Sequence, residues 1–240
     1  MYMPQDSSCG MVFKRFEYKY LLDEDKYRMI MSYIRPHTIP DVHGLTTICN
    51  MYYDTSDNDL IRMSIDKPLY KEKLRLRSYG VPDADSMVFM EIKKKYDRIV
   101  YKRRISLTLQ QAEDYLIDGV VPPVRKEHMQ RFNEIDYFVH FHGIRPAMFV
   151  AYDRAAFFDR SDRNMRITFD SNIRSRTTNL TLGSLEGCEP YDFGYKYVME
   201  LKGCDSFPLW LVGMLSELHI YKGTFTKYGR LYKREIERKI

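Results

Sequence analysis

Hydrophobic and polar residues alternate with a period of two along most of this chain, which predicts a fold built largely of β-strands. Clusters of turn residues separate the alternating segments, as at Gly80 and Pro82. The predicted strands cover residues 13–20, 47–53, 70–79, 87–94, 99–107, 147–157, 165–170 and 195–202.

Hydrophobic residues that recur every three to four positions predict helices between these strands. Asp23 opens one that runs to residue 35, and Thr108 with Gln111 gives the capping-box sequence of another that ends at Gly119. The pattern is that of an α+β protein. Further helices are predicted over 57–65, 124–142, 206–219, where Ser206 is the expected N-cap, and 229–240.

The chain has 240 residues, of which 44% are hydrophobic, and this is ample for a buried core. No internal repeat and no linker-like change of composition divides it. We therefore expect a single domain over residues 1–240, with a core at about 12–230, a tail at 1–11 and the C-terminal helix at 229–240.

Cations gather on one face of the predicted strands, because successive side chains of a strand point to opposite faces. In the strand 70–79, positions 71, 73, 75 and 77 are all Lys or Arg, whereas 74 and 76 are Leu. A solvated face explains any one such strand, but at least six strands repeat the pattern, and a solvated face would mix both charge signs. Helices are expected to cover the apolar face. The charged face would then turn inward, into a barrel with a polar, cation-rich lumen.

Packed cations in a lumen require anions, since uncompensated buried charge is costly. A chain of phosphates fits, because Arg offers a bidentate fork to phosphate oxygens and Lys a point charge. The few carboxylates among the cations suit a divalent metal ion with oxygen ligands. Metal-assisted chemistry on phosphates follows as a hypothesis.

The overall charge alone does not indicate a nucleic-acid partner. The chain has 38 Lys and Arg against 33 Asp and Glu, a formal net charge of +5. RNA recognition would place aromatic residues on the basic face, whereas most aromatics here fall on the opposite parity. No nucleic-acid partner is expected. No GxxxxGK[ST], GxGxxG or GxSxG motif supports another nucleotide-binding or hydrolase fold.

The cysteines and the hydrophobic segments predict a cytoplasmic protein. Cys9, Cys49, Cys188 and Cys204 are scattered and form no CxxC pair, which is typical of reduced thiols. The N-terminus lacks the apolar region of a signal peptide. The longest apolar stretch, 207–215, is far shorter than the roughly 20 residues of a bilayer span. Any link to a membrane would come through a separate partner.

Eight short motifs, in order along the chain, resemble those of one family. That family is the catalytic domain of the VTC (vacuolar transporter chaperone) proteins, polyphosphate polymerases within the triphosphate tunnel metalloenzymes. No single motif is specific, but their shared order over about residues 12–230 is. The motifs are FEYKY (16–20), KLRLRSYG (73–80), FMEIK (89–93), KRR (102–104), YDRAAF (152–157), RITFD (166–170), MELK (199–202) and FTKY (225–228).

The resemblance implies a closed antiparallel eight-stranded β-barrel, or tunnel, with helices packed outside. It implies one metal ligand, Glu200, for Mn²⁺ or Mg²⁺. The residues that it places at the transferred phosphoryl group are Lys19, Arg75, Arg77, Lys93, Arg154 and Lys227. Further phosphate-binding residues are Lys102, Arg104, Tyr152, Arg166, Lys202 and Thr226.

The implied activity is metal-dependent transfer of the γ-phosphoryl group of ATP to a growing polyphosphate chain, with release of ADP. Arg15 stands where tunnel hydrolases and cyclases carry the first of two carboxylates, which favours the polymerase branch. Two alternatives stay open: a tripolyphosphate or nucleoside triphosphate hydrolase of the same fold, and a non-catalytic polyphosphate-binding module. The sequence does not indicate an oligomeric state.

Overall fold

The computed structural model describes residues 16–66, 68–97, 99–203 and 206–238. The predicted strand start at residue 13, together with Arg15, Cys9 and Cys204, lies outside these residues. The chain divides into two compact units, and strands β7 and β8 contribute to both. The first unit comprises the residues up to 44, 155–169 and 197–224, and the second comprises 45–154, 170–196 and the residues from 225 onward.

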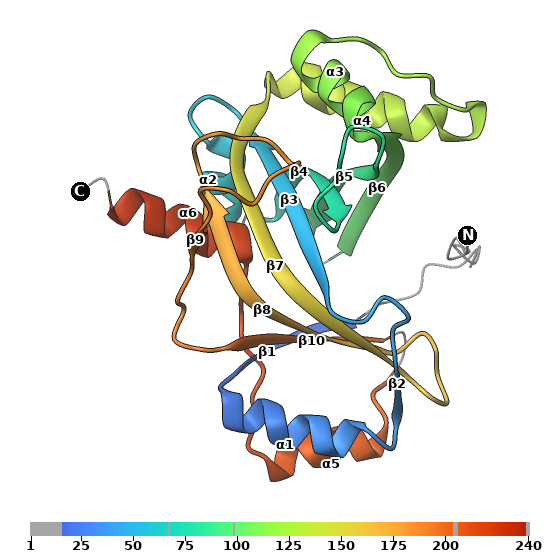
Figure 1. The fold of residues 1–240 in the computed structure, drawn as a ribbon, viewed down its shortest axis with the longest axis vertical. Coiled ribbons are helices and arrows are strands. Elements are labelled where there is room, and N and C mark those ends of the chain that lie inside the picture. Colours follow the sequence, from blue (N-terminus) through green and yellow to red (C-terminus); the bar gives the residue numbers. More distant parts are fainter. Residues whose placement is uncertain (1–15, 67, 98, 204–205, 239–240) are drawn as a thin grey trace. The chain divides into compact units, whose positions relative to one another are not determined.

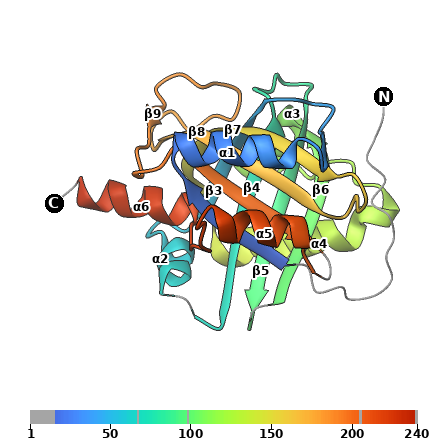
Figure 2. The ribbon, with the colours of Figure 1, turned by 90° about the horizontal axis from the view of Figure 1, so that it is seen from below.

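The first unit packs two helices against a small antiparallel sheet. Strand β1 pairs with β10 along its whole length, from Phe16 opposite Gly203 to Leu22 opposite Tyr197. Helices α1 and α5 lie side by side (Figures 1 and 2). The elements are β1 (Phe16–Leu22), α1 (Glu24–Ile34), β2 (Thr38–Pro40), the end of β7 (Arg145–Asp159), the start of β8 (Arg166–Arg176), β10 (Tyr197–Gly203) and α5 (Leu209–Glu217).

The second unit is a larger antiparallel sheet with most of the helices. Its strand order is β8-β7-β3-β4-β5-β6, with the short strand β9 on β8. The remaining elements are β3 (Thr46–Asp54), α2 (Asp59–Ile65), β4 (Tyr70–Tyr79), β5 (Met87–Tyr96), β6 (Ile99–Thr108), α3 (Leu109–Asp118), the 3₁₀ helix η1 (Lys126–His128), α4 (Met129–His142), β9 (Glu189–Pro190) and α6 (Lys227–Glu237).

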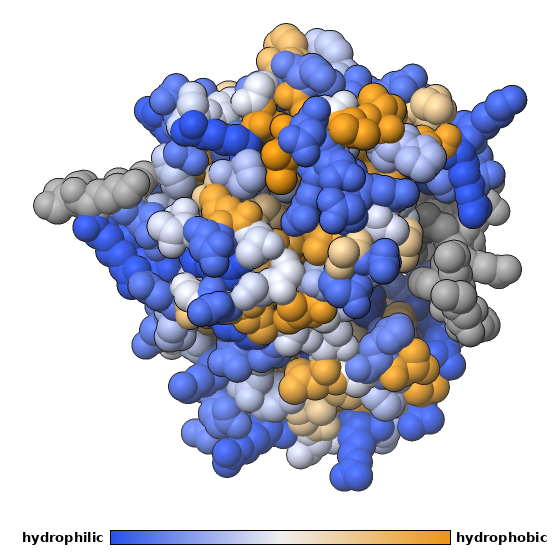
Figure 3. Space-filling model, turned by 45° about the horizontal axis from the view of Figure 1, so that its top comes forward, coloured by the Kyte–Doolittle hydropathy of each residue, from blue (hydrophilic) through white to orange (hydrophobic). Residues whose placement is uncertain are grey.

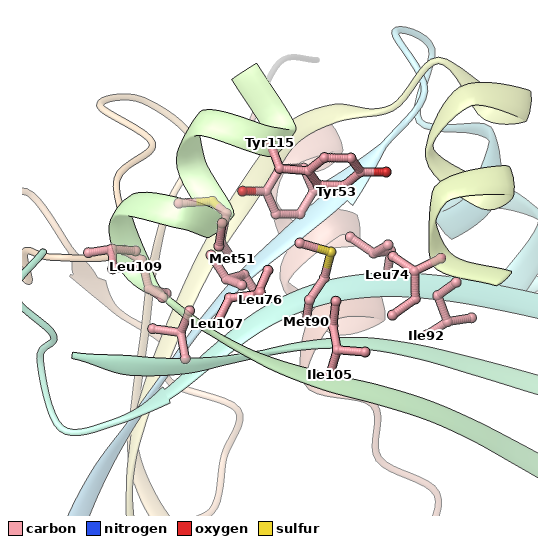
Figure 4. Packing of buried hydrophobic residues seen from close by; sticks show 14 of the residues in the cluster. Met51, Tyr53, Leu74, Leu76, Met90, Ile92, Ile105, Leu107, Leu109 and Tyr115 are labelled. Carbon is pink, nitrogen blue, oxygen red and sulfur yellow. The ribbon is translucent and has the colours of Figure 1, made fainter. Parts of the chain in front are cut away.

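Helices α3 and α4 cover the apolar face of β5 and β6 (Figure 1). The strand residues buried beneath them come from even-numbered positions of β4 and β5 and from odd-numbered positions of β6 (Figure 4). This confirms the division of these strands by parity, because the cations of β4 then lie on the other face of the sheet. The layer includes Leu74, Leu76, Met90, Ile92, Ile105 and Leu107.

The predicted helix ends at Asp23, Thr108 and Gly119 are confirmed. The Asp23 side chain accepts a hydrogen bond from the Lys26 N–H at 2.8 Å and caps α1. Thr108 and Gln111 form the reciprocal capping box of α3, and Gly119 ends that helix in the left-handed region, at φ 73°.

Other predicted helix starts are wrong: α2 starts at Asp59 and not at residue 57, and α6 starts at Lys227 and not at residue 229. The N-cap of α5 is Pro208 and not Ser206. Pro208 has an extended ψ, and its carbonyl accepts hydrogen bonds from the N–H groups of Leu211 and Val212, so the helix starts without a capping side chain. Helix α4 starts at Met129 and not at residue 124, because Arg125 is extended and a 3₁₀ turn follows it. Strands β7 and β8 run further than predicted, and β2 and β9 were not predicted at all.

The closed barrel is not confirmed. Among the described residues, β1 pairs in the sheet only with β10 and β6 only with β5, so the strand path has two ends. The antiparallel α+β class is confirmed. None of the helices in the described part of the chain has the length and hydrophobicity of a membrane span. On the face shown in Figure 3, hydrophobic side chains lie in patches separated by hydrophilic ones.

Candidate functional site

One row of directly opposed residues crosses four strands of the second unit. Tyr52 on β3 lies opposite Arg75 on β4, Arg75 opposite Glu91 on β5, and Glu91 opposite Arg104 on β6. Opposed residues of adjacent strands point to the same face and interact directly. The sheet register therefore collects a phenol, two guanidinium groups and a carboxylate from four separate segments of the chain.

Glu91 is the counterion at the centre of this row. Its side chain is 2% exposed and contacts Arg75 at 2.7 Å, Lys102 at 2.9 Å and Arg104. Burial acts to raise the pKa of Glu91, but the positive charges of Arg75, Arg77, Lys102 and Arg104 together lower it well below its ordinary value. Glu91 is therefore ionised at neutral pH, and it holds three predicted phosphate ligands in place.

Arg77 and Tyr152 connect this row to strand β7. Arg77 is 8% exposed, and its Nε donates to Asn50 Oδ1 at 2.8 Å, while one terminal nitrogen donates to the Tyr152 hydroxyl at 3.2 Å. The Tyr152 ring is also the contact surface for two further cations, because Arg154 lies 5.3 Å and Lys227 4.3 Å from its centroid. Tyr152 thus lies among three predicted phosphate ligands.

Asp170 is the second buried counterion. It is fully buried and accepts two hydrogen bonds from Arg154, at 2.6 and 2.7 Å, and one from Lys227 at 2.5 Å. The bidentate geometry fixes the plane of the Arg154 guanidinium. The cations gathered around Glu91, Tyr152 and Asp170 are called the cation cluster below; they are Arg75, Arg77, Lys102, Arg104, Arg154 and Lys227.

A second row places three lysines directly opposite one another. Lys73 on β4 lies opposite Lys93 on β5, which lies opposite Lys102 on β6. Like charges in this position are unfavourable, and burial lowers the pKa of Lys102 below its ordinary value. Because Lys93 lies opposite Lys102, this predicted ligand lies beside the cation cluster on the same face of the sheet.

Tyr52 is a member of this site that the sequence did not indicate. It is 6% exposed and stacks on Tyr228 of α6 with the ring centroids 4.3 Å apart, while the Tyr228 hydroxyl donates to Asp54. Burial opposes ionisation of the phenol, but the positive charges of Arg75, Lys73 and Arg77 outweigh it and lower the pKa of Tyr52 to about 8.

This shift gives a spectroscopic prediction. In an absorbance titration at 295 nm, we expect one tyrosine of the folded protein to ionise near pH 8 and this step to disappear in Tyr52→Phe. Since the folded pKa lies below the ordinary value of 10, the stability of wild type relative to Tyr52→Phe should rise between pH 8 and 10 and be lost as the pH falls through 8. Tyr53→Phe is the matched control, because burial raises the pKa of Tyr53. Persistence of the step in Tyr52→Phe would assign it to another residue.

The first unit holds a separate group of paired charges on β1 and β10. Lys19 lies opposite Glu200, and Glu17 opposite Lys202. Lys19 Nζ lies 3.3 Å from Glu200 and 3.5 Å from Glu17, and Lys202 Nζ lies 3.1 Å from Glu200. Burial acts to lower the pKa of Lys19, but the two carboxylates outweigh it and raise the pKa. Three predicted site residues, Lys19, Glu200 and Lys202, thus lie together.

The donor set of this group fits a hard divalent cation. Glu200 is nearly buried, and Glu17 shares both lysine partners with it, so two carboxylates face the same ammonium groups. Mg²⁺ and similar ions are commonly held by one or two carboxylates, with phosphate oxygens and water as the other ligands. No group of three or more His, Cys, Asp or Glu suited to a metal occurs among the described residues. A metal here would thus need oxygens from outside the protein.

Two predicted ligands have other partners. Arg166 lies in the first unit, where it pairs with Asp41 at 2.9 Å and packs over the Phe158 ring. The Thr226 hydroxyl accepts a hydrogen bond from the Gly229 N–H at 3.0 Å at the start of α6, so its oxygen already serves as a helix cap.

Comparison with known proteins gives a family and a fold. The VTC domain family matches the chain over residues 14–234. Vacuolar transporter chaperone complex subunit 4 of Schizosaccharomyces pombe is 26% identical over 145 residues, which is 52% of this chain and 20% of that protein. The crystal structure of a "putative adenylate cyclase" from Bacillus halodurans has a TM-score of 0.53 at 16% identity, and the match covers 88% of this chain and 92% of the other.

The chain belongs to the VTC domain family, since the match covers nearly all of it. This confirms the resemblance seen in the eight sequence motifs. At 16% identity the bacterial structure shows a shared fold and nothing about activity. The chain spans only a fifth of the yeast protein.

Proposed function

We propose that this chain is a metal-dependent phosphotransferase that passes the γ-phosphoryl group of ATP to a polyphosphate chain and releases ADP. The observation that carries the proposal is the cation cluster with its lysine row. Seven Lys and Arg residues of β4–β7 share one face of the second unit's sheet, and Lys227 of α6 joins them through Asp170; the two buried carboxylates among these cations are Glu91 and Asp170. This excess of positive charge on fixed side chains suits an extended polyanion.

The cluster suits phosphoryl transfer because this reaction mostly requires positioning and neutralisation of charge. A terminal phosphate oxygen of the acceptor chain attacks the γ-phosphorus, the bond from that phosphorus to the β-bridging oxygen breaks, and ADP leaves with the bond electrons. Arg75 and Arg154 are held by their carboxylate partners and would bind phosphate oxygens through their guanidinium groups. The Tyr152 hydroxyl would donate a hydrogen bond to a phosphate oxygen.

The Glu200 group of the first unit would hold the divalent ion, Mn²⁺ or Mg²⁺. Such an ion would neutralise charge on phosphate oxygens. Lys19 and Lys202, which belong to the same group of residues, would bind phosphate oxygens. The name of the yeast relative describes a subunit of a complex, which supports the proposal that this chain has a protein partner; that partner would supply any link to a membrane. The cytoplasmic location stays a prediction.

The test is to incubate the purified protein with ATP and Mn²⁺ or Mg²⁺ and to separate the products on a gel that resolves phosphate chains. We expect a ladder of polyphosphate, ADP in proportion to the phosphate incorporated, and no chains after the metal is removed with EDTA. Free phosphate without chains would make the protein a hydrolase. Tight polyphosphate binding without ATP turnover would make it a binding module. Either result would overturn the proposal.

A further inference from the structure

Three aromatic residues at alternate positions, Tyr191, Phe193 and Tyr195, follow β9 and form an array of neighbouring rings. The ring centroids of Tyr191 and Phe193 are 6.0 Å apart at 21°, and those of Phe193 and Tyr195 are 6.4 Å apart at 34°. Tyr195 is 45% exposed, and the other two rings are partly exposed. They are called the aromatic array below.

The aromatic array is held in a defined conformation. Its first residue is tied to β8, because the Tyr191 N–H donates to the Ile173 carbonyl at 2.8 Å. Gly194, between Phe193 and Tyr195, has a φ of 80°, a left-handed conformation that glycine adopts at little cost. Its N–H donates to Asp192 Oδ1 at 2.9 Å. Arg234 of α6 packs over the Tyr191 ring at 5.3 Å.

The aromatic array also borders the cation cluster. Phe225 is 3% exposed and lies 4.9 Å from Phe193, centroid to centroid. On the cluster side, Lys227 Nζ lies 5.9 Å from the same Phe225 ring, and Arg230 also packs over it at 5.0 Å. One buried ring thus separates partly exposed aromatic faces from Lys227, the ion-pair partner of Asp170.

We propose that the aromatic array binds the nucleobase of a nucleoside triphosphate by stacking, while the cation cluster binds its phosphates. The inference rests on the proposed function for the phosphate half of the ligand. Every nucleobase has a flat π-face that can stack on an aromatic ring, whatever hydrogen-bonding groups its edge carries. Neighbouring cations add to the attraction. A partly exposed aromatic surface next to a triphosphate-binding cluster matches the two chemical halves of such a nucleotide.

The test compares two ligands that differ only in the nucleoside. We expect Phe193→Ala to weaken ATP binding about 10-fold in calorimetry, from the usual contribution of one base stack, and to leave tripolyphosphate binding unchanged. Tyr195→Leu, a change at the more exposed ring, should act in the same direction. In Phe193→Trp, ATP should quench the new tryptophan fluorescence and tripolyphosphate should not, with wild-type Trp210 as the baseline.

Equal weakening for both ligands, or no effect on either, would overturn the inference and leave the aromatic array a packing element of α6. The proposed function fails separately. A protein that makes no polyphosphate but binds ATP through Phe193 keeps the inference. If Phe193→Ala makes polyphosphate with the same Michaelis constant for ATP as wild type, the inference is refuted and the proposed function stands.

Discussion

Asp170→Asn is expected to lower the free energy of unfolding by about 3–5 kcal/mol, the usual effect of removing one partner from a buried ion pair. The substitution keeps the shape of the side chain but leaves Arg154 and Lys227, whose side chains are 13% and 10% exposed, without a negative charge between them. Asp170 itself is fully buried, so solvent cannot take over this role. For a chain of this length, the loss should appear as a fall in the melting temperature of about 6–20 °C.

The matched control is Glu189→Gln in the same unit. It removes the same charge from an ion pair with Arg238, but the side chains of both Glu189 and Arg238 are more than half exposed. Exposed pairs contribute little to stability, so its melting temperature should stay close to that of wild type. If Asp170→Asn melted no earlier than this control, the Arg154–Asp170–Lys227 group would not be a structural element of the cation cluster.

The division of strand residues by parity is the part of the fold that the sequence could predict. In β4 the even positions Leu74 and Leu76 are buried and the odd positions carry the cations, as the alternation indicates. Local signals also placed the capping box at Thr108. Pairing between distant strands and the ends of β7 and β8 depend on tertiary contacts, which alternation within one segment does not encode.

The counterions are the part of the site that sequence reasoning missed. It treated the cations as needing an external anion, whereas Glu91 and Asp170 already neutralise part of their charge inside the protein. A signal was present, since Glu91 shares the parity of Lys93 and Asp170 that of Arg166. Parity gives the face but not the partner, and register decides that Glu91 lies opposite Arg75 and Arg104. The low pKa of Tyr52 depends on the same register.

The internal carboxylates change how phosphate binding is expected to work. Each arginine beside Glu91 or Asp170 is held in one geometry before any ligand arrives, so little side-chain entropy is lost on binding. Preorganised donors of this kind stabilise developing charge more effectively than mobile ones.

Arg75→Ala is accordingly expected to reduce polyphosphate synthesis by about 10²–10³-fold, the usual cost of losing one preorganised donor to a transition-state charge. Arg75 lies in the centre of the Tyr52–Arg75–Glu91–Arg104 row and is only 22% exposed. The fold should survive, because Glu91 keeps Lys102 and Arg104 as partners. The measurement is the initial rate of ADP release under saturating ATP, with circular dichroism to confirm the fold.

Arg103→Ala is the control for Arg75→Ala, because it also removes an arginine but from the opposite face of the sheet. Arg103 follows Lys102 on β6 but points to the opposite face, where it pairs with Glu134 of α4 at 2.8 Å. Its loss should leave the rate within about twofold of wild type, since its side chain points away from the face that carries the cation cluster. Equal rates for Arg75→Ala and Arg103→Ala would mean that the reaction does not take place on the cation face. A deficit confined to Arg75→Ala would place phosphoryl transfer there, with the Glu91-held guanidinium as a direct contributor.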